Sequence, residues 1–71
     1  MKDIKINKEP VELYKILKFE GIADSGGEAK AMIDAGLVMV NGQVEMRKRN
    51  KIVSGTIIEV AGHQFKIVFE P

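Results

Sequence analysis

The pattern of apolar residues in the N-terminal third of the chain predicts one strand followed by one helix. The stretch DIKIN alternates, which indicates a short first strand. Apolar residues then recur at helical spacing, at Leu13, Ile16 and Leu17. Pro10 fits the first turn of this helix, where its missing N–H costs nothing, and Gly21 fits its C-terminal cap. Lys15 and Lys18 fall on the opposite, exposed side.

A second helix is predicted by a clearer start. Ser25 and Glu28 form the S-x-x-E pattern of a capping box, and Gly36 fits the end of the helix. Its apolar face consists of Ala29, Met32 and Ile33. Only a few residues separate this helix from the first, so we expect the two to pack as a pair.

The remaining sequence predicts β-strands. LVMV runs into Asn41-Gly42, the strongest short hairpin pattern. A strict two-residue turn places Met39 and Val44 on one face but sets the neighbouring valines opposite polar residues, so the register stays open. TIIEV follows a turn at Ser54-Gly55. A second turn at Ala61-Gly62-His63 leads into a last strand, whose buried face is expected to carry Phe65, Ile67 and Phe69.

Composition narrows the class of protein. The 71 residues suffice for one domain with one core and a shallow surface site, and they carry a net charge of only +1. The absence of cysteine excludes a disulfide scaffold and a cysteine zinc module. The N-terminal sequence lacks the apolar run of a signal peptide, and no segment has the roughly 20 apolar residues of a membrane span. We therefore expect a soluble, cytoplasmic protein that does not bind membranes.

Positive charge is concentrated in one segment, RKRNK. Arg47, Lys48, Arg49 and Lys51 give four positive charges in five residues, with no acid between Glu45 and Glu59. Clustered Lys and Arg are typical of a nucleic-acid surface. Because no acidic residue lies between them in the sequence, we expect these charges to repel one another. A solvated loop is the plainer interpretation. We favour an RNA-backbone contact, because strands on both sides can present the loop rigidly.

The predicted start of the second helix is a candidate phosphate site. Gly26 and Gly27 leave the free N–H groups of the first turn accessible, and Lys30 lies one turn further on. Glu28 argues against this site because it adds a negative charge. Alternatively, the two glycines only permit close packing.

Nothing in the sequence indicates catalysis, a cofactor or a small-molecule substrate. His63 is a lone histidine, expected to be exposed in a turn, and no group of residues has metal-ligand or paired acid–base spacing. The aromatic residues do not form the sheet motif that stacks single-stranded bases, which favours structured RNA.

Several stretches together resemble the S-four RNA-binding domain, named for the fourth protein of the small ribosomal subunit, and within that family the stand-alone bacterial YbcJ-like proteins. They are SGGEAK, the apolar pair Met32-Ile33, GLVMVNG and SGTII. The resemblance implies a small single α+β domain over residues 1–71 with a core motif at about 12–60. It further implies the α-L arrangement, in which two packed helices lie against a bent antiparallel sheet.

The resemblance also implies contacts with structured RNA, either ribosomal RNA or a ribosome-assembly intermediate. Contact with the ribosome or with ribosome-assembly proteins is expected as well. The expected RNA-binding residues are Ser25, Gly26, Gly27, Lys30, Arg47, Lys48, Arg49 and Lys51, with Lys15 and Lys18 beside them. The sequence departs from the family pattern at Val11-Glu12-Leu13, Gly26 and Thr56, so the basic loop is expected to carry more of the binding. The alternative function is an adaptor that docks an acidic protein, such as an RNA-processing enzyme.

Overall fold

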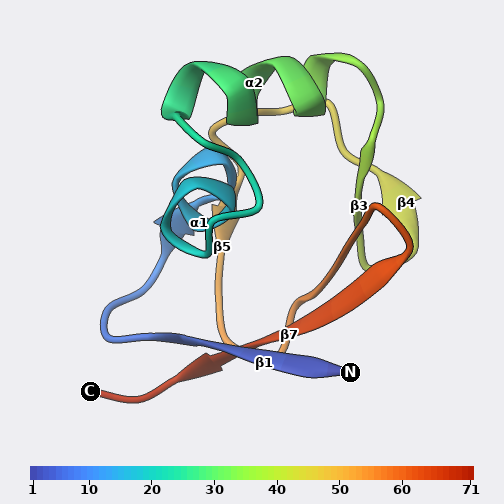
Figure 1. Ribbon diagram of the computed structural model, residues 1–71. Coiled ribbons are helices and arrows are strands. Elements are labelled where there is room, and N and C mark those ends of the chain that lie inside the picture. Colours follow the sequence, from blue (N-terminus) through green and yellow to red (C-terminus); the bar gives the residue numbers. More distant parts are fainter.

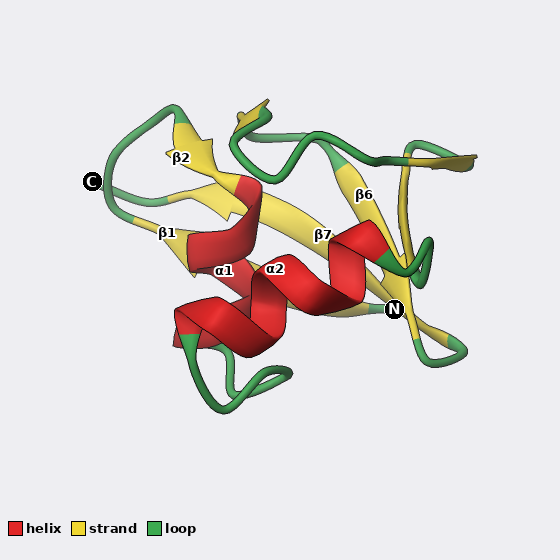
Figure 2. Cartoon of the chain, turned by 90° about the horizontal axis from the view of Figure 1, so that it is seen from above, coloured by secondary structure: helices red, strands yellow, loops and turns green.

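The computed structural model describes residues 1–71, and two helices lie over one face of a curved sheet (Figures 1 and 2). The elements in chain order are β1 (Lys2–Ile6), β2 (Val11–Glu12), α1 (Leu13–Phe19), α2 (Gly26–Asp34), β3 (Val38–Val40), β4 (Gln43–Val44), β5 (Lys51–Ile52), β6 (Ile57–Val60) and β7 (His63–Phe69). Both helices end as predicted. Gly21 and Gly36 follow them with φ of 74° and 75°, a conformation that glycine adopts without a Cβ clash.

The main sheet is mixed, so the prediction of an antiparallel sheet was wrong at one strand. Its order is β1-β7-β6-β3-β4, and β1 runs parallel to β7, with Ile4 opposite Ile67. The other neighbours are antiparallel. Alternation of apolar residues is the same in both kinds of strand, so the N-terminal pattern could not reveal the direction of pairing. Residues 7–62 form the long crossover that a parallel pair needs.

The core lies between the helices and the sheet, and it contains the predicted stripe of α1. Its buried members are Ile4, Val11, Leu13, Ile16, Leu17, Ala23, Ala29, Ile33, Val38, Ile52, Ile58, Val60 and Ile67. Burying each large aliphatic side chain contributes about 1.5–3 kcal/mol relative to exposure. Met32 and Phe65 pack against this cluster at its margin and are only partly buried.

Pro10 does not belong to α1, which corrects the prediction. Its bond to Glu9 is cis, and the helix begins three residues later at Leu13. The helix starts late because Val11 and Glu12 are extended and pair with Ile52 and Lys51 of β5. This small second sheet connects the start of α1 to the far end of the basic loop.

The two predicted hairpin turns form, and the structure settles the open register. Met39 lies opposite Val44, and the turn residues Asn41 and Gly42 have φ of 51° and 86°. Positive φ at both positions is what a two-residue hairpin turn requires. The second turn is Ala61-Gly62 alone. His63 is the first residue of β7, opposite Val60, and not a turn residue as predicted, although it is exposed.

Candidate nucleic-acid interface

The start of α2 is capped largely as the sequence predicts. Ser25 is extended, and its Oγ accepts a 3.1 Å hydrogen bond from the Glu28 N–H. The Glu28 carboxylate accepts from the Asp24 N–H at 3.2 Å, one residue earlier than the usual capping box. The N–H groups of Gly26 and Gly27 have no acceptor in the protein. Two free donors therefore remain at the positive end of the helix dipole.

The two glycines have different surroundings. A Cβ on Gly26 would lie 3.7 Å from Cε2 of Tyr14, an ordinary contact, so Gly26 packs beside that ring. Gly27 is exposed, and a Cβ there would meet only Ser25 Oγ at 3.8 Å. Close packing alone therefore accounts for neither glycine, since alanine would fit at both positions.

Tyr14 is the centre of the basic cluster, although no pattern in the sequence indicates a role for it. The Lys30 Nζ lies 4.6 Å from the ring centroid, the Arg49 Cζ 5.7 Å and the Lys15 Nζ 5.9 Å. These distances fall within the range of cation–π attraction. The ring thus gathers cations from α2, the basic loop and α1. A helical wheel could have placed Tyr14 on the outward side of α1, but not beside Lys30 or Arg49.

The basic loop is held over the first turn of α1 by its own carbonyls. The N–H of Leu13 donates to the Asn50 carbonyl at 2.9 Å, and the N–H of Tyr14 donates to the Lys48 carbonyl at 3.1 Å. No side chain caps α1, so these two loop carbonyls satisfy donors that would otherwise be free. The loop is therefore part of the helix start, which fixes Arg49 near the Tyr14 ring.

Acidic side chains relieve the repulsion that the sequence suggested. Arg47 pairs with Glu45 at 3.1 Å, Lys48 with Asp34 at 3.0 Å and Arg49 with Glu12 at 3.4 Å. The prediction of an unrelieved charge cluster was wrong, because two of these acids are distant in sequence. Lys51 has no acidic partner.

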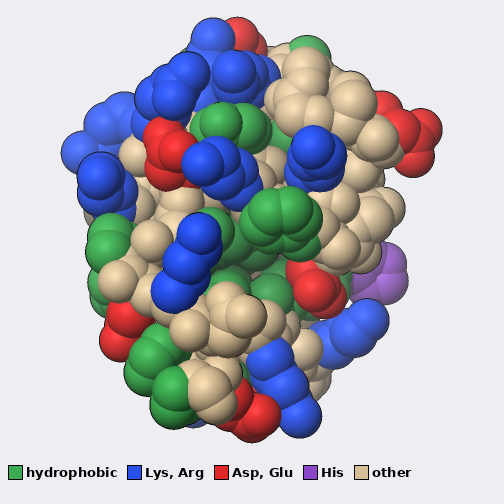
Figure 3. Space-filling model, turned by 90° about the vertical axis from the view of Figure 1, so that its left-hand side faces the viewer, with side chains coloured by type: hydrophobic (Ala, Val, Ile, Leu, Met, Phe, Trp, Pro, Cys, Tyr) green, Lys and Arg blue, Asp and Glu red, His purple; other side chains and the backbone are tan.

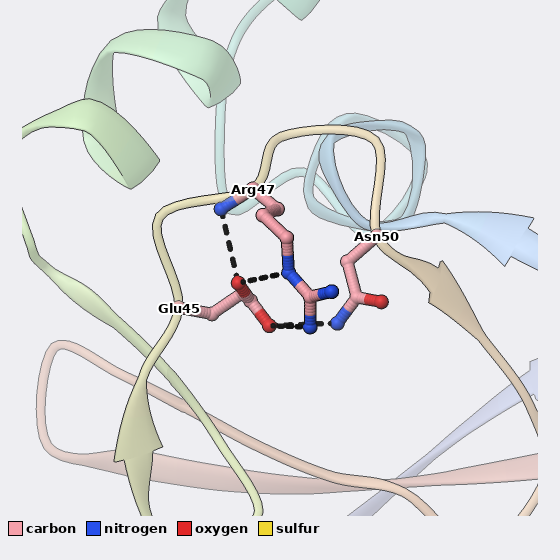
Figure 4. Close-up of polar contacts among 3 residues, drawn as sticks. All are labelled: Glu45, Arg47 and Asn50. Atoms are coloured by element: carbon pink, nitrogen blue, oxygen red, sulfur yellow. Dashed lines mark hydrogen bonds and ion pairs between the residues drawn. The ribbon is translucent and has the colours of Figure 1, made fainter.

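Glu45 organises the outer part of the loop (Figure 4). One of its oxygens accepts from the Arg47 N–H at 3.0 Å and from Arg47 Nε at 3.1 Å. The other accepts from Arg47 Nη2 at 3.2 Å and from Asn50 Nδ2 at 2.8 Å. These bonds, those of the Arg47 guanidinium first, hold the pKa of the Glu45 carboxyl below its ordinary value. The same pairing raises the pKa of Arg47.

Glu12 plays a similar part nearer the Tyr14 ring. Its carboxylate binds Lys15 Nζ at 3.0 Å as well as Arg49. The hydrogen bond from Lys15 is the main cause that lowers the pKa of Glu12, and the same bond raises the pKa of Lys15. Lys15 and Arg49 are therefore held in place but half neutralised, whereas Lys30 has no acidic partner.

An open groove runs beside this cluster, between α1, the β1–β2 connection and β5. Its charged lining consists of Lys5, Lys8, Lys15, Lys18, Lys51, Glu12 and Glu70. Figure 3 views this side of the molecule and shows Lys and Arg side chains spread across it with fewer acidic ones between them. A surface of this sign attracts polyanions.

The structure thus brings together most of the predicted site. Lys15, Lys30 and Arg49 meet at Tyr14, while Lys15, Lys18, Lys51 and Gly26 line the groove. Ser25 and Gly27 lie at the adjoining start of α2. Arg47 and Lys48 point to acids instead of to Tyr14.

The structure contains neither a cluster of metal ligands nor a membrane-spanning helix. No three His, Asp or Glu side chains lie close enough together to hold a metal ion. Neither helix is long and apolar enough to cross a membrane.

Comparison with known families agrees with this geometry. The model of the S4 domain, the S-four domain named above, matches residues 4–68. The chain belongs to the S4-domain family. The predicted relationship to YbcJ-like proteins is confirmed, since YbcJ of Escherichia coli (strain K12) is 46% identical over 69 residues, covering 96% of this chain and 99% of YbcJ.

Two further comparisons place this S4 domain among its relatives. The Bacillus subtilis (strain 168) protein named "Probable ribosome maturation protein RlbA" is 32% identical over 66 residues, covering 92% of this chain and 93% of that protein. The solution structure of YbcJ from E. coli superposes with a TM-score of 0.72, covering 96% of this chain and 87% of that one. It is described as revealing an ALFAL motif involved in RNA binding. The predicted family and α-L fold are confirmed.

Proposed function

We propose that this protein is a non-catalytic RNA-binding protein that recognises structured RNA, either ribosomal RNA or a ribosome-assembly intermediate, mainly through backbone phosphates. The observation that carries the proposal is the convergence of Lys15, Lys30 and Arg49 on Tyr14, beside the free N–H groups of α2. Cations and helix N-termini are the usual protein groups that bind phosphate oxygens. The expected partners are structured RNA and, with it, the ribosome or ribosome-assembly proteins.

The arrangement favours reading RNA by shape. Three cations from separate segments are held at fixed positions, so they fit phosphates at a fixed spacing better than those of a flexible chain. Double-stranded RNA is recognised mostly by shape and backbone contacts. The named relatives support the same direction, since YbcJ carries a motif involved in RNA binding and RlbA is named for ribosome maturation.

A direct binding assay tests the proposal. A labelled RNA hairpin is titrated with the protein, and a DNA duplex of the same sequence serves as competitor. We expect the hairpin to bind and the DNA duplex to compete weakly. Equal competition by DNA, or no binding at low salt, would reject recognition of structured RNA.

An adaptor function is the second candidate, and one observation favours it. The side chains of Leu37, Val44 and Met46 are exposed by 56%, 55% and 54%. All three come before the basic loop in the sequence, and Met46 directly precedes it. Exposed apolar side chains beside charge suit a protein partner. The test replaces these three residues with serine. Loss of an acidic partner protein from a pull-down, with unchanged affinity for the RNA hairpin, would support the adaptor function.

A further inference from the structure

The outward face of α1 carries two aromatic rings and two lysines that all line the groove. They are Tyr14, Lys15, Lys18 and Phe19. At 3.6 residues per turn these four positions form one continuous side of the helix, opposite the buried stripe. Lys8 of the β1–β2 connection and Lys51 of β5 contribute to the same lining.

Three lysines of the groove are free to bind an anion. The two glutamates of the lining are already engaged, Glu12 with Lys15 and Arg49, and Glu70 with Lys5 at 3.7 Å. Lys8, Lys18 and Lys51 have no carboxylate within 4.0 Å. The groove therefore keeps a surplus of positive charge after its internal pairs are counted.

Phe19 is exposed beside these lysines. It is 71% exposed, although Ile16 and Leu17 of the same helix are buried. Because most of the Phe19 side chain is exposed to solvent, it contributes little to the hydrophobic core, and packing does not explain an aromatic residue at this position. Its exposed face is available for stacking, whereas the Tyr14 ring already has Gly26 and Lys30 against it.

We propose that this groove binds a single-stranded RNA segment, with a base stacked on Phe19 and neighbouring phosphates on Lys8, Lys18 and Lys51. This inference rests on the proposed function: the segment adjoins the structured RNA held at Tyr14, and the groove adds contacts to unpaired nucleotides. A positive groove with an exposed aromatic ring is the usual pattern of single-strand recognition. The carboxylates of an acidic peptide would use the lysines, but they do not stack on an aromatic ring as a base does.

The test compares one RNA hairpin with the same hairpin carrying a single-stranded uridine tail. Wild-type protein is expected to bind the tailed RNA more tightly. Phe19→Leu keeps an apolar side chain without the ring and should remove about 5- to 150-fold of affinity for the tailed RNA, the usual effect of one stacked base. Phe19→Trp should retain the gain. Both substitutions lie at an exposed position, so the fold should survive, which amide NMR spectra can check.

The lysines are tested in the same pair of RNAs. Lys8→Ala, Lys18→Ala and Lys51→Ala should each reduce the gain from the tail, while Lys66→Ala, at an exposed position of β7 outside the groove, should not. Oligouridine alone should shift the NMR signals of Phe19 and Lys18 in the wild-type protein.

The outcomes separate this inference from the proposed function. Binding of the plain hairpin with no gain from the tail, or an equal gain in Phe19→Leu, overturns the groove inference alone. Failure of both RNAs to bind overturns the proposed function and the inference together. A polyglutamate peptide that displaces the tail and binds Phe19→Leu as well as wild type would assign the groove to an acidic protein instead.

Discussion

The Lys30 ammonium lies 4.6 Å from the centroid of the Tyr14 ring and has no carboxylate partner. This contact joins the first turn of α1 to the first turns of α2, and it holds a full positive charge at a ring that also lies beside Gly26. The basic loop reaches the same ring through Arg49. Tyr14 therefore positions the cations, and its substitution should affect RNA binding without removing any charge.

Replacing Tyr14 tests this positioning role. Tyr14→Leu should lower hairpin affinity several-fold and destabilise the fold by about 1–2 kcal/mol, because a partly buried ring and its cation contacts are lost. Tyr14→Phe should bind and melt like wild type, because the phenol hydroxyl makes no hydrogen bond in the protein. Fluorescence anisotropy and thermal unfolding measure the two effects. A loss of binding in Tyr14→Phe equal to that in Tyr14→Leu would assign the role to the hydroxyl.

The basic loop should contribute through its charge. Changing Arg47, Lys48, Arg49 and Lys51 together to alanine should weaken binding of different hairpins by at least about tenfold, because phosphate contacts are not sequence-specific. Unchanged hairpin affinity in this quadruple variant would remove the loop from the site.

A matched pair of single substitutions locates the effect. Lys51 and Lys66 are both exposed strand lysines without an acidic partner, but only Lys51 lines the groove. Lys51→Ala should weaken the binding of the hairpin with a tail, and Lys66→Ala should not. Equal losses would indicate a general charge effect instead of a defined surface.

Gly27→Ala separates the two interpretations of the α2 start. Alanine fits there, and it should stabilise the helix by up to about 1 kcal/mol. If a phosphate approaches the Gly27 N–H closely, the added methyl group should reduce hairpin affinity despite the more stable fold. Urea unfolding and RNA titration on the same sample measure both. Unchanged affinity would argue that no phosphate lies there.

Removing the Ser25 cap of α2 should destabilise the fold, whereas Gly27→Ala should stabilise it. Ser25→Ala should cost about 0.5–2 kcal/mol in urea unfolding, because the Glu28 N–H loses its acceptor. Ser25→Asp preserves a capping oxygen and should stay close to wild type, but its negative charge should weaken RNA binding. A Ser25→Ala protein of unchanged stability would contradict the capping role.

The Glu45 pair predicts an acid-sensitive loop. The pKa of Glu45 is lower in the folded chain than in the unfolded chain, so the stability it contributes is present above about pH 4.3, the ordinary glutamate value, and is lost as the pH falls below it. Arg47 is mostly exposed, which limits the contribution to about 1 kcal/mol or less. Melting temperatures of wild type and Glu45→Gln should therefore differ at pH 7 and converge in acid. A constant difference would contradict this linkage.

Local patterns in the sequence predicted the elements well. Helical spacing at Leu13, Ile16 and Leu17 identified the buried side of α1, and Asn41-Gly42 identified a hairpin. These features depend on neighbouring residues alone. The late start of α1 could not be predicted from Pro10, because it results from pairing with β5, which is distant in the sequence.

The site was predicted less completely, for the same reason. The acids that neutralise Arg49 and Lys48 lie at Glu12 and Asp34 in other elements, so the loop looked more highly charged than it is. Phe19 could have been placed on the exposed side of α1 by helical periodicity, next to Lys15. The closeness of Lys30 to the basic loop was implied only by the family resemblance. Their meeting at the Tyr14 ring depends on tertiary packing and was not predicted.

The salt dependence of hairpin binding tests the central claim most directly, with wild type compared with the Lys15→Ala, Lys30→Ala, Arg49→Ala triple variant. If about four phosphates are neutralised, log affinity of wild type should fall against log salt with a slope of roughly −3 to −4. The triple variant should show a slope shallower by about 2 to 3, since each lost phosphate contact removes about one unit. Equal slopes for the two proteins would contradict the account, because the cations gathered at Tyr14 would then not contact RNA.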